Sequence, residues 1–213
     1  MLPLEIPPGT TVESLLTEVL PALHERLVSD SAPADPLAVV VRVEGRGGWT
    51  VHIRGRHMRV EEGEVPRPTL WVHTTGLAVQ RLLDDALGPR RFLPDVDATL
   101  ARVPDGGVLL LSDPRLVKRV AMVSGRVELA MTDDDGARLS VVLGLGDAAR
   151  RPIDPERPQC VAEGPRSVLE RALRGELAPE EAITGGAVRV RGNRLLVLQL
   201  ALAVAPFYPR RSP

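Results

Sequence analysis

Aromatic residues and cysteine are scarce in this chain of 213 residues. Five aromatic residues are too few for the stacking platform that single-strand nucleic-acid binders use: Trp49, Trp71, Phe92, Phe207 and Tyr208. The 27 basic residues are balanced by 28 acidic ones, so the formal net charge is -1 and no basic excess is available to neutralise phosphates. Both shortages argue against nucleic acid as a partner.

The single cysteine, Cys160, excludes an intrachain disulfide framework and a multi-cysteine zinc site. Long hydrophobic runs are also missing, since the longest, 195–206, is interrupted by Gln199 and falls short of the roughly 20 residues that span a bilayer. The first residues lack the basic segment and apolar core of a signal peptide. With 44% apolar residues, the sequence predicts a soluble cytoplasmic protein with a substantial core and no integral membrane segment.

The first half of the chain predicts a helix, a hairpin, two further strands and two more helices. The helix at 11–28 can use Thr10 or Thr11 as its N-cap. The β-branched residues of 37–44, followed by a glycine-rich turn and a strand from Trp49, indicate a hairpin. The elements predicted next are a strand at 69–74, a helix at 77–87, a strand at 96–103 and a helix that opens at 112–114 and runs to 123.

The same order of elements recurs after Gly125. A hairpin is predicted first, and its Asp-Gly turn at 133–136 suits that backbone. The other predicted elements are strands at 126–132 and 137–143, a short strand at 160–161, helices at 165–174 and from Pro179, a strand at 187–191, and a last helix from Asn193 toward Pro206.

A segment of the first half aligns with a segment of the second without a gap. Residues 68–89 lie over residues 158–179 at a constant offset of 90. Identical positions are Pro68/Pro158, Arg81/Arg171, Leu83/Leu173, Leu87/Leu177 and Pro89/Pro179. The hairpins upstream match after a two-residue shift, which places Gly48 over Gly136. We interpret the chain as a duplicated unit, with one half at 1–124 and the other at 125–213.

The residues of 172–202 contain a series of short motifs after a helix. These are Gly175-Glu176-Leu177, then Pro179-Glu180-Glu181-Ala182, then Gly186-Ala187-Val188-Arg189-Val190-Arg191-Gly192, and an apolar helix from Asn193. This order resembles the sterol carrier protein 2 family of lipid-binding domains, called SCP2-like below, and the likeness extends over 158–202. The first half is similar in its strand, Gly-Trp turn and strand, and departs from the pattern at 90–97 and 104–107.

The resemblance implies an α+β fold, with a twisted, mostly antiparallel sheet or sheets covered by helices in two SCP2-like halves. It also implies an apolar tunnel for fatty acyl, sterol-like or isoprenoid lipids and a carrier or accessory role without catalysis. Some bacterial relatives assist ubiquinone biosynthesis. No cofactor is expected.

The stretch at 195–205 is apolar around almost its whole circumference, so we expect its leucines to be covered by protein, by a partner or by ligand. It is either a core helix joining the two halves or one wall of a lipid site. The predicted lipid-binding residues, which fall on the expected inner faces of the second half, are Val168, Leu169, Leu173, Ile183, Val188, Val190, Leu195, Leu198 and Leu202.

The sequence offers no set of catalytic or metal-binding residues. The run 144–149 has the spacing of a dinucleotide-binding loop, but the prolines after it favour an ordinary loop. The aspartates at 133–135 lack the glutamate of a calcium loop. Cys160 is interpreted as a buried structural thiol. The four histidines are interpreted as surface residues: His24, His52, His57 and His73.

Two other functions remain open at the level of sequence. The protein can be a scaffold or complex subunit, in which the halves pack into a filled core and bind a protein partner or a second copy. It can also be an enzyme of unrecognised type, although no convergent polar set is apparent. The sequence leaves undecided whether the halves share one sheet.

Overall fold

The computed structural model describes residues 10–27, 36–79, 81, 114–151, 157–173 and 177–204. The strand predicted at 96–103 and most of the helix predicted at 77–87 lie outside the described residues. None of the described helices is both long and apolar enough to cross a membrane.

The helix predicted at 11–28 is present as three consecutive pieces: α1 (Val12–Ser14), η1 (Leu15–Val19) and α2 (Leu20–Leu27). The Thr11 hydroxyl accepts a hydrogen bond from the Ser14 backbone N–H at 3.1 Å, which confirms Thr11 as the N-cap. The middle piece is π-helical and ends just before Pro21, which has no backbone N–H to donate. The apolar face of this segment is buried.

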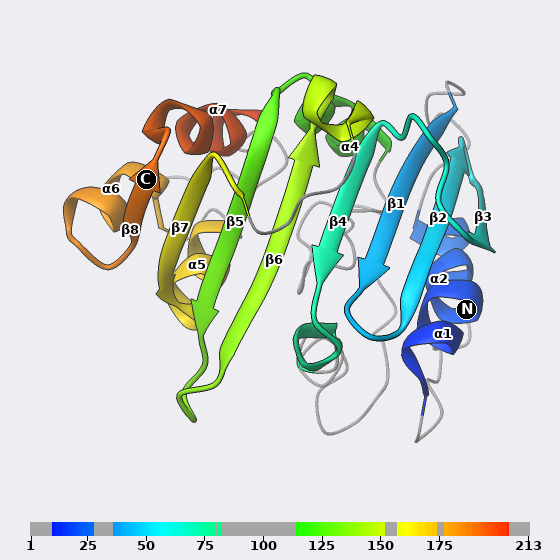
Figure 1. Ribbon diagram of the computed structural model, residues 1–213, viewed down its shortest axis with the longest axis horizontal. Helices are drawn as coiled ribbons and strands as arrows, with labels where there is room; N and C mark the ends of the chain where they lie inside the picture. Colours follow the sequence, from blue (N-terminus) through cyan, green and yellow to red (C-terminus); the bar gives the residue numbers. More distant parts are fainter. Residues whose placement is uncertain are drawn as a thin grey trace.

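Eight strands form one mixed sheet in the order β3-β2-β1-β4-β6-β5-β7-β8 (Figure 1). The strands are β1 (Leu37–Val43), β2 (Gly47–Arg54), β3 (His57–Glu62), β4 (Leu70–Thr74), β5 (Gly125–Thr132), β6 (Arg138–Leu145), β7 (Cys160–Pro165) and β8 (Arg189–Gly192). The pairs β1–β4 and β5–β7 are parallel, and the other neighbours are antiparallel. The chain therefore has an α+β architecture built on a single sheet.

The second half contributes most of the remaining described helices. These are η4 (Gly146–Arg150), α5 (Arg166–Leu173), α6 (Pro179–Thr184) and α7 (Arg194–Val204). The helix α4 (Pro114–Ala121) lies just before the second half. The helices predicted before 123, at 165–174, from Pro179 and from Asn193 are thus confirmed, and so is the hairpin with its turn at 133–136. The strand β3 was not predicted, because its two apolar residues alternate with charged ones at an exposed edge.

The two parallel pairs, β1–β4 and β5–β7, are each joined in the same way just before the later strand. The Thr69 N–H donates to the Ala38 carbonyl at 2.7 Å, and the Thr69 hydroxyl accepts from the Ala38 N–H at 3.2 Å. The Gln159 N–H donates to the Arg126 carbonyl at 3.0 Å, and the Gln159 side-chain oxygen accepts from the Arg126 N–H at 3.0 Å. Thr69 and Gln159 are 90 residues apart, the offset of the aligned segments.

The proposed match of Gly48 with Gly136 is wrong. Gly48 lies within β2 opposite Arg42, whereas Gly136 lies in the turn between β5 and β6 with a φ of 82°. The position in β6 that corresponds to Gly48 is Ser140, which lies opposite Ala130. The second turn is longer than the first, and this shifts the second strand of the hairpin relative to the sequence alignment.

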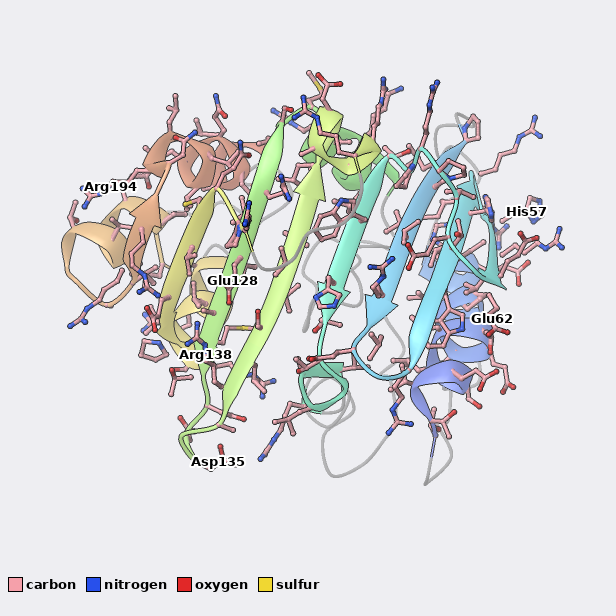
Figure 2. The ribbon with its side chains drawn as sticks, viewed as in Figure 1. His57, Glu62, Glu128, Asp135, Arg138 and Arg194 are labelled. Carbon is pink, nitrogen blue, oxygen red and sulfur yellow. The ribbon has the colours of Figure 1, made fainter. Side chains whose placement is uncertain are left out.

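The two faces of the sheet differ in chemistry because successive side chains point to opposite sides. The inner face is aliphatic and belongs to the main core, and α2 and α5 lie behind the sheet in the view of Figure 1. The outer face carries mostly charged side chains, including Glu128 and Arg138 (Figure 2). Its apolar part is a small cluster of Val40, Trp71, Val142 and Ala149.

We expect Gly144→Ala to destabilise the protein by about 1 to 3 kcal/mol, the usual effect of overpacking. A Cβ at Gly144 would overlap the indole of Trp71, whose side chain is fully buried on the outer face. Gly76→Ala is the matched control, since its Cβ would meet no atom closer than 3.8 Å. Chemical denaturation of both variants measures the difference, and equal stabilities would contradict this account of Trp71.

Candidate functional site

The structure describes the side chains of eight of the nine residues predicted to line a lipid site, and these eight differ in burial. Three of them are buried in the core, namely Leu169, Val188 and Val190. Three others are partly buried, namely Val168, Ile183 and Leu198. Leu195 and Leu202 are exposed, and the side chain of Leu173 lies outside the described residues.

The chain itself leaves two leucines of α7 exposed, Leu195 at 61% and Leu202 at 64%, and their coverage by a partner or a ligand stays a prediction. The helix packs on the sheet through Leu196, Leu200 and Ala203, which recur at helical spacing and are buried. An α-helix resting on one surface turns its other side to solvent, whatever residues that side carries.

Beneath α7 the interior is filled. A Cβ at Gly125 would lie 2.6 Å from the Leu196 side chain, so the helix approaches the sheet as closely as a glycine allows. The inward residues of β7 are small as well, Cys160, Ala162 and Gly164. Burial raises the pKa of the Cys160 thiol, consistent with the predicted buried structural cysteine. This region is packed protein.

The middle of the inner face is different, because four aliphatic side chains there are only partly buried. They are Val72 on β4, Leu129 on β5, and Val141 and Leu143 on β6. Val72 lies opposite Leu143, and Val141 lies opposite Leu129 in the strand register. We call these four residues the central patch.

Fully buried residues border the central patch on both sides. Along one row of the sheet, Val72 and Leu143 lie between Val41 and Val127, whose exposed fractions are 5% and 0%. Among the described helices, α2 contacts β3 and α4 contacts β1, while α5 and α7 contact β7 and also β5, the strand of Leu129. The partly exposed aliphatic surface of the described inner face is therefore centred on the seam where the two halves of the sheet meet.

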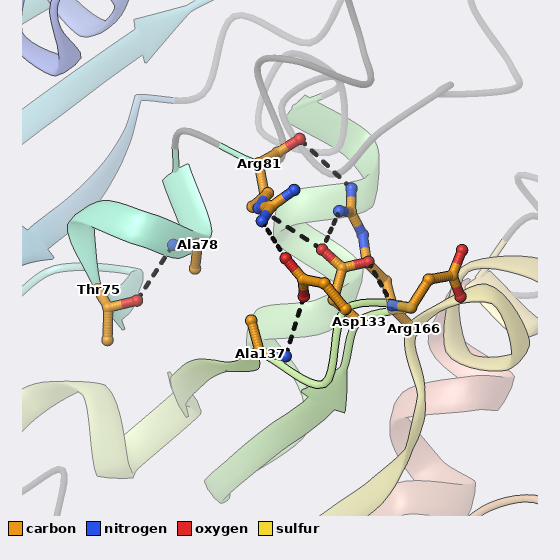
Figure 3. Close-up of polar contacts among 8 residues, drawn as sticks. Thr75, Ala78, Arg81, Asp133, Ala137 and Arg166 are labelled. Carbon is orange, nitrogen blue, oxygen red and sulfur yellow. Dashed lines mark hydrogen bonds and ion pairs between the residues drawn. The ribbon is translucent and has the colours of Figure 1, made fainter.

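A cluster of charged residues lies around the turn between β5 and β6, with Asp133 and Arg166 labelled in Figure 3. Asp133 accepts from Arg166 at 3.4 Å and lies 3.6 Å from the Arg81 guanidinium. Arg166, at the start of α5, is buried and also donates to the Arg81 carbonyl at 3.4 Å. Arg81 is paired with Asp135 in addition. The cluster ties three segments together: the helical segment after β4, the β5–β6 turn and α5.

Ion pairs also cross the outer face. Arg42 donates to both oxygens of Glu64 at 2.6 and 2.7 Å. Glu128 accepts from the Ser140 hydroxyl at 3.0 Å and lies 3.6 Å from Arg138. Arg42 of β1 thus pairs with a residue that follows β3, and Glu128 pairs across the neighbouring strands β5 and β6, so the outer face carries ion-paired groups.

The weaker sequence motifs have structural roles. Within the part of the chain that the structure describes, no three His, Cys, Asp or Glu side chains are grouped as metal ligands would be. The run 144–149 forms the end of β6 and the short helix η4. The expectation that all four histidines lie on the surface is wrong for His24, which is buried where α2 meets the sheet and has its Nε2 2.9 Å from the Gly55 carbonyl oxygen.

Comparison with known proteins adds little to these observations. No protein-family model matches the chain, and no curated protein matches it. One solved structure that it resembles is the solution structure of a conserved hypothetical protein from Thermus thermophilus, described as a candidate sterol carrier protein. The two are 20% identical, with a TM-score of 0.31, over 45% of this chain and 78% of the other.

The residues of the central patch were missed by the sequence analysis. Strand alternation marks Val72, Leu129, Val141 and Leu143 as inward-facing once their strands are assigned. Their grouping depends on the pairing of β4 with β6, which are separated by more than 60 residues. No local pattern in the sequence carries that information.

We expect Asp133→Asn to destabilise the protein by about 3 kcal/mol, because a neutral amide replaces the carboxylate that pairs with the buried Arg166. Asp134→Asn is the matched control, since Asp134 lies next to Asp133 on the exposed turn. Thermal and chemical denaturation measure both. Equal stability of the two variants would show that Asp133 does not hold Arg166.

A pH dependence follows from His73 on the outer face. Burial, and then the nearby Arg42 cation, lower the pKa of His73 below its usual value near 6.5, against the opposing effect of Glu44 and Glu64. As pH falls below about 6.5 the unfolded chain takes up a proton that the folded chain resists, so the free energy of unfolding decreases.

We therefore expect the free energy of unfolding of His73→Asn to decrease less between neutral and mildly acidic pH than that of the unmodified protein. The exposed His57→Asn is the control. Denaturant titrations at a series of pH values give the slopes, and a His73→Asn slope identical to that of the unmodified protein would contradict the assignment.

Proposed function

We propose that this protein is a non-enzymatic binding protein that holds the chain of an apolar lipid, of fatty acyl, sterol-like or isoprenoid type, against the central patch. The observation that carries the proposal is the partial exposure of four aliphatic side chains in the middle of the inner face, between buried strands. Aliphatic surface at such a place is the chemistry that an apolar chain contacts.

Desolvation supplies the binding energy. Each methylene that leaves water contributes about 0.8 kcal/mol, so a chain of several methylenes gains affinity without any hydrogen bond to the protein. Two residues on opposite sides of the β4–β6 seam, Val72 and Leu143, would contact such a chain together. Asp133, the first residue after β5, is already engaged with Arg81 and Arg166.

We further propose that the chain consists of two SCP2-like halves, at 1–124 and 125–213, working in the cytoplasm as a carrier or accessory protein. The matching junctions at Thr69 and Gln159 support a common origin of the halves. So does the recurrence, in each half, of a hairpin whose first strand pairs in parallel with a later strand of the same half. In this arrangement the lipid site lies between the halves and not within the second one.

We expect the delipidated protein to bind a fluorescent fatty acid, and Leu143→Gln to weaken that binding about tenfold, since a polar amide replaces aliphatic contact surface. Val141→Thr, nearly the same in shape, is a second patch variant that tests the same effect with less risk to folding. Leu202→Gln is the matched control, because Leu202 is exposed on α7 and was predicted to line the site.

Native mass spectrometry of the protein as purified provides a second readout, in which we expect a co-purified lipid. An apo protein whose melting temperature does not change with added lipid would overturn the proposal and favour the scaffold alternative. A loss of binding in Leu202→Gln with none in the patch variants would place the site on α7.

A further inference from the structure

Basic side chains gather at one end of the sheet, where β6 ends and β5 begins. This end carries α4, η4 and α7, shown at the top of Figure 1. The three helices are adjacent: α4 contacts α7, and a Cβ at Gly146, the first residue of η4, would lie 2.7 Å from the Val123 carbonyl that follows α4. The exposed basic residues of these elements and their ends are Lys118, Arg119, Arg150, Arg151 and Arg194.

Acidic residues are scarce in the described elements of this end. Neither α4 nor α7 contains an aspartate or a glutamate, and η4 contains only Asp147. The opposite end of the sheet holds the three consecutive aspartates of the β5–β6 turn, with Asp135 labelled there in Figure 2. Of those aspartates, Asp133 and Asp135 are paired with Arg81 and Arg166, whereas the five exposed basic residues of the first end are accompanied in its described helices by one carboxylate.

Large apolar side chains are exposed on the same basic end. Met122, directly after α4, is 82% exposed, and Leu195 and Leu202 of α7 are 61% and 64% exposed. Leu195 and Leu202 are seven residues apart and thus lie on one side of the helix. These apolar side chains lie beside several arginines, and the helices α4, η4 and α7 together contain one carboxylate. The surface is therefore both apolar and cationic.

We propose that this end of the molecule docks on an anionic lipid bilayer, with Met122, Leu195 and Leu202 entering the interface and the arginines meeting the lipid headgroups. Leucine favours the boundary between headgroups and acyl chains, and each Lys or Arg near an anionic membrane strengthens binding. Charge complementarity selects this occupant, because an apolar protein partner would not require the exposed basic residues. The surface is separate from the central patch, so the inference goes beyond lipid carriage and does not depend on it.

Sedimentation with phosphatidylcholine vesicles, with and without phosphatidylglycerol, tests the proposal. We expect binding to the anionic vesicles alone, weakened by added salt. The double variants Leu195→Gln/Leu202→Gln and Arg119→Glu/Arg150→Glu should each bind at least about tenfold more weakly. All four positions are exposed, so the variants should keep the unmodified melting temperature.

The matched control is Leu77→Gln/Arg46→Glu, which changes an exposed leucine and an exposed arginine at the opposite end of the sheet. It should bind vesicles as the unmodified protein does. Fluorescent fatty acid binding in the absence of vesicles is measured for every variant. We expect the docking variants to retain it, which separates a failure of docking from a failure of lipid carriage.

Equal binding to neutral and anionic vesicles, or no binding to either, would overturn the proposal. So would docking variants that bind as tightly as the control. Light scattering provides the remaining test, because it measures whether the protein is a dimer. If Leu195→Gln/Leu202→Gln converts a dimer to monomer and leaves vesicle binding unchanged, the surface binds a second copy of the chain and the proposal is wrong.

Discussion

The pairing of β4 with β6 is the interaction on which the rest of the structure depends. Every strand at the edge of a sheet exposes unpaired N–H and C=O groups, and these two strands satisfy each other from Leu70 opposite Leu145 to Thr74 opposite Val141. Two sets of strands thereby become one sheet of eight. The hairpin of the second half has no outer third strand like β3, since β4 occupies that position beside β6. The seam also brings together the aliphatic residues of the central patch, which come from both halves of the chain.

The alternation of side chains along the strands gives the sheet its two distinct faces. Inward residues such as Val39 and Leu145 are fully buried, while outward residues such as Arg42 and Glu128 form ion pairs across the sheet surface. The free edges are protected in the manner usual for soluble sheets. The strand β3 carries charges on its outward side, and β8 has only four residues, two of them arginines. The polar face and the charged edges leave the inner face as the place where apolar contacts can form.

Helix packing divides that inner face into a filled part and an accessible part. Small residues on β7 and the glycine at 125 let α7 pack closely on the second half of the sheet. At the seam, larger side chains such as Val72 and Leu143 are only partly covered. The same close packing turns Leu195 and Leu202 outward. One arrangement of α7 thus accounts both for the packed interior beneath it and for the apolar surface above it.

Local patterns in the sequence determined most of the secondary structure, because strand alternation, helix caps and turn residues act over a few neighbouring positions. They were enough for the hairpins, for Thr11 as a cap and for the buried Cys160. They were not enough for β3, for the burial of His24 or for the exposure of Leu195. Each of these depends on which element lies against another, and so does the union of both halves in one sheet. Only the tertiary structure decided them, since the pairing of β4 with β6 and the packing of α7 join residues far apart in the chain.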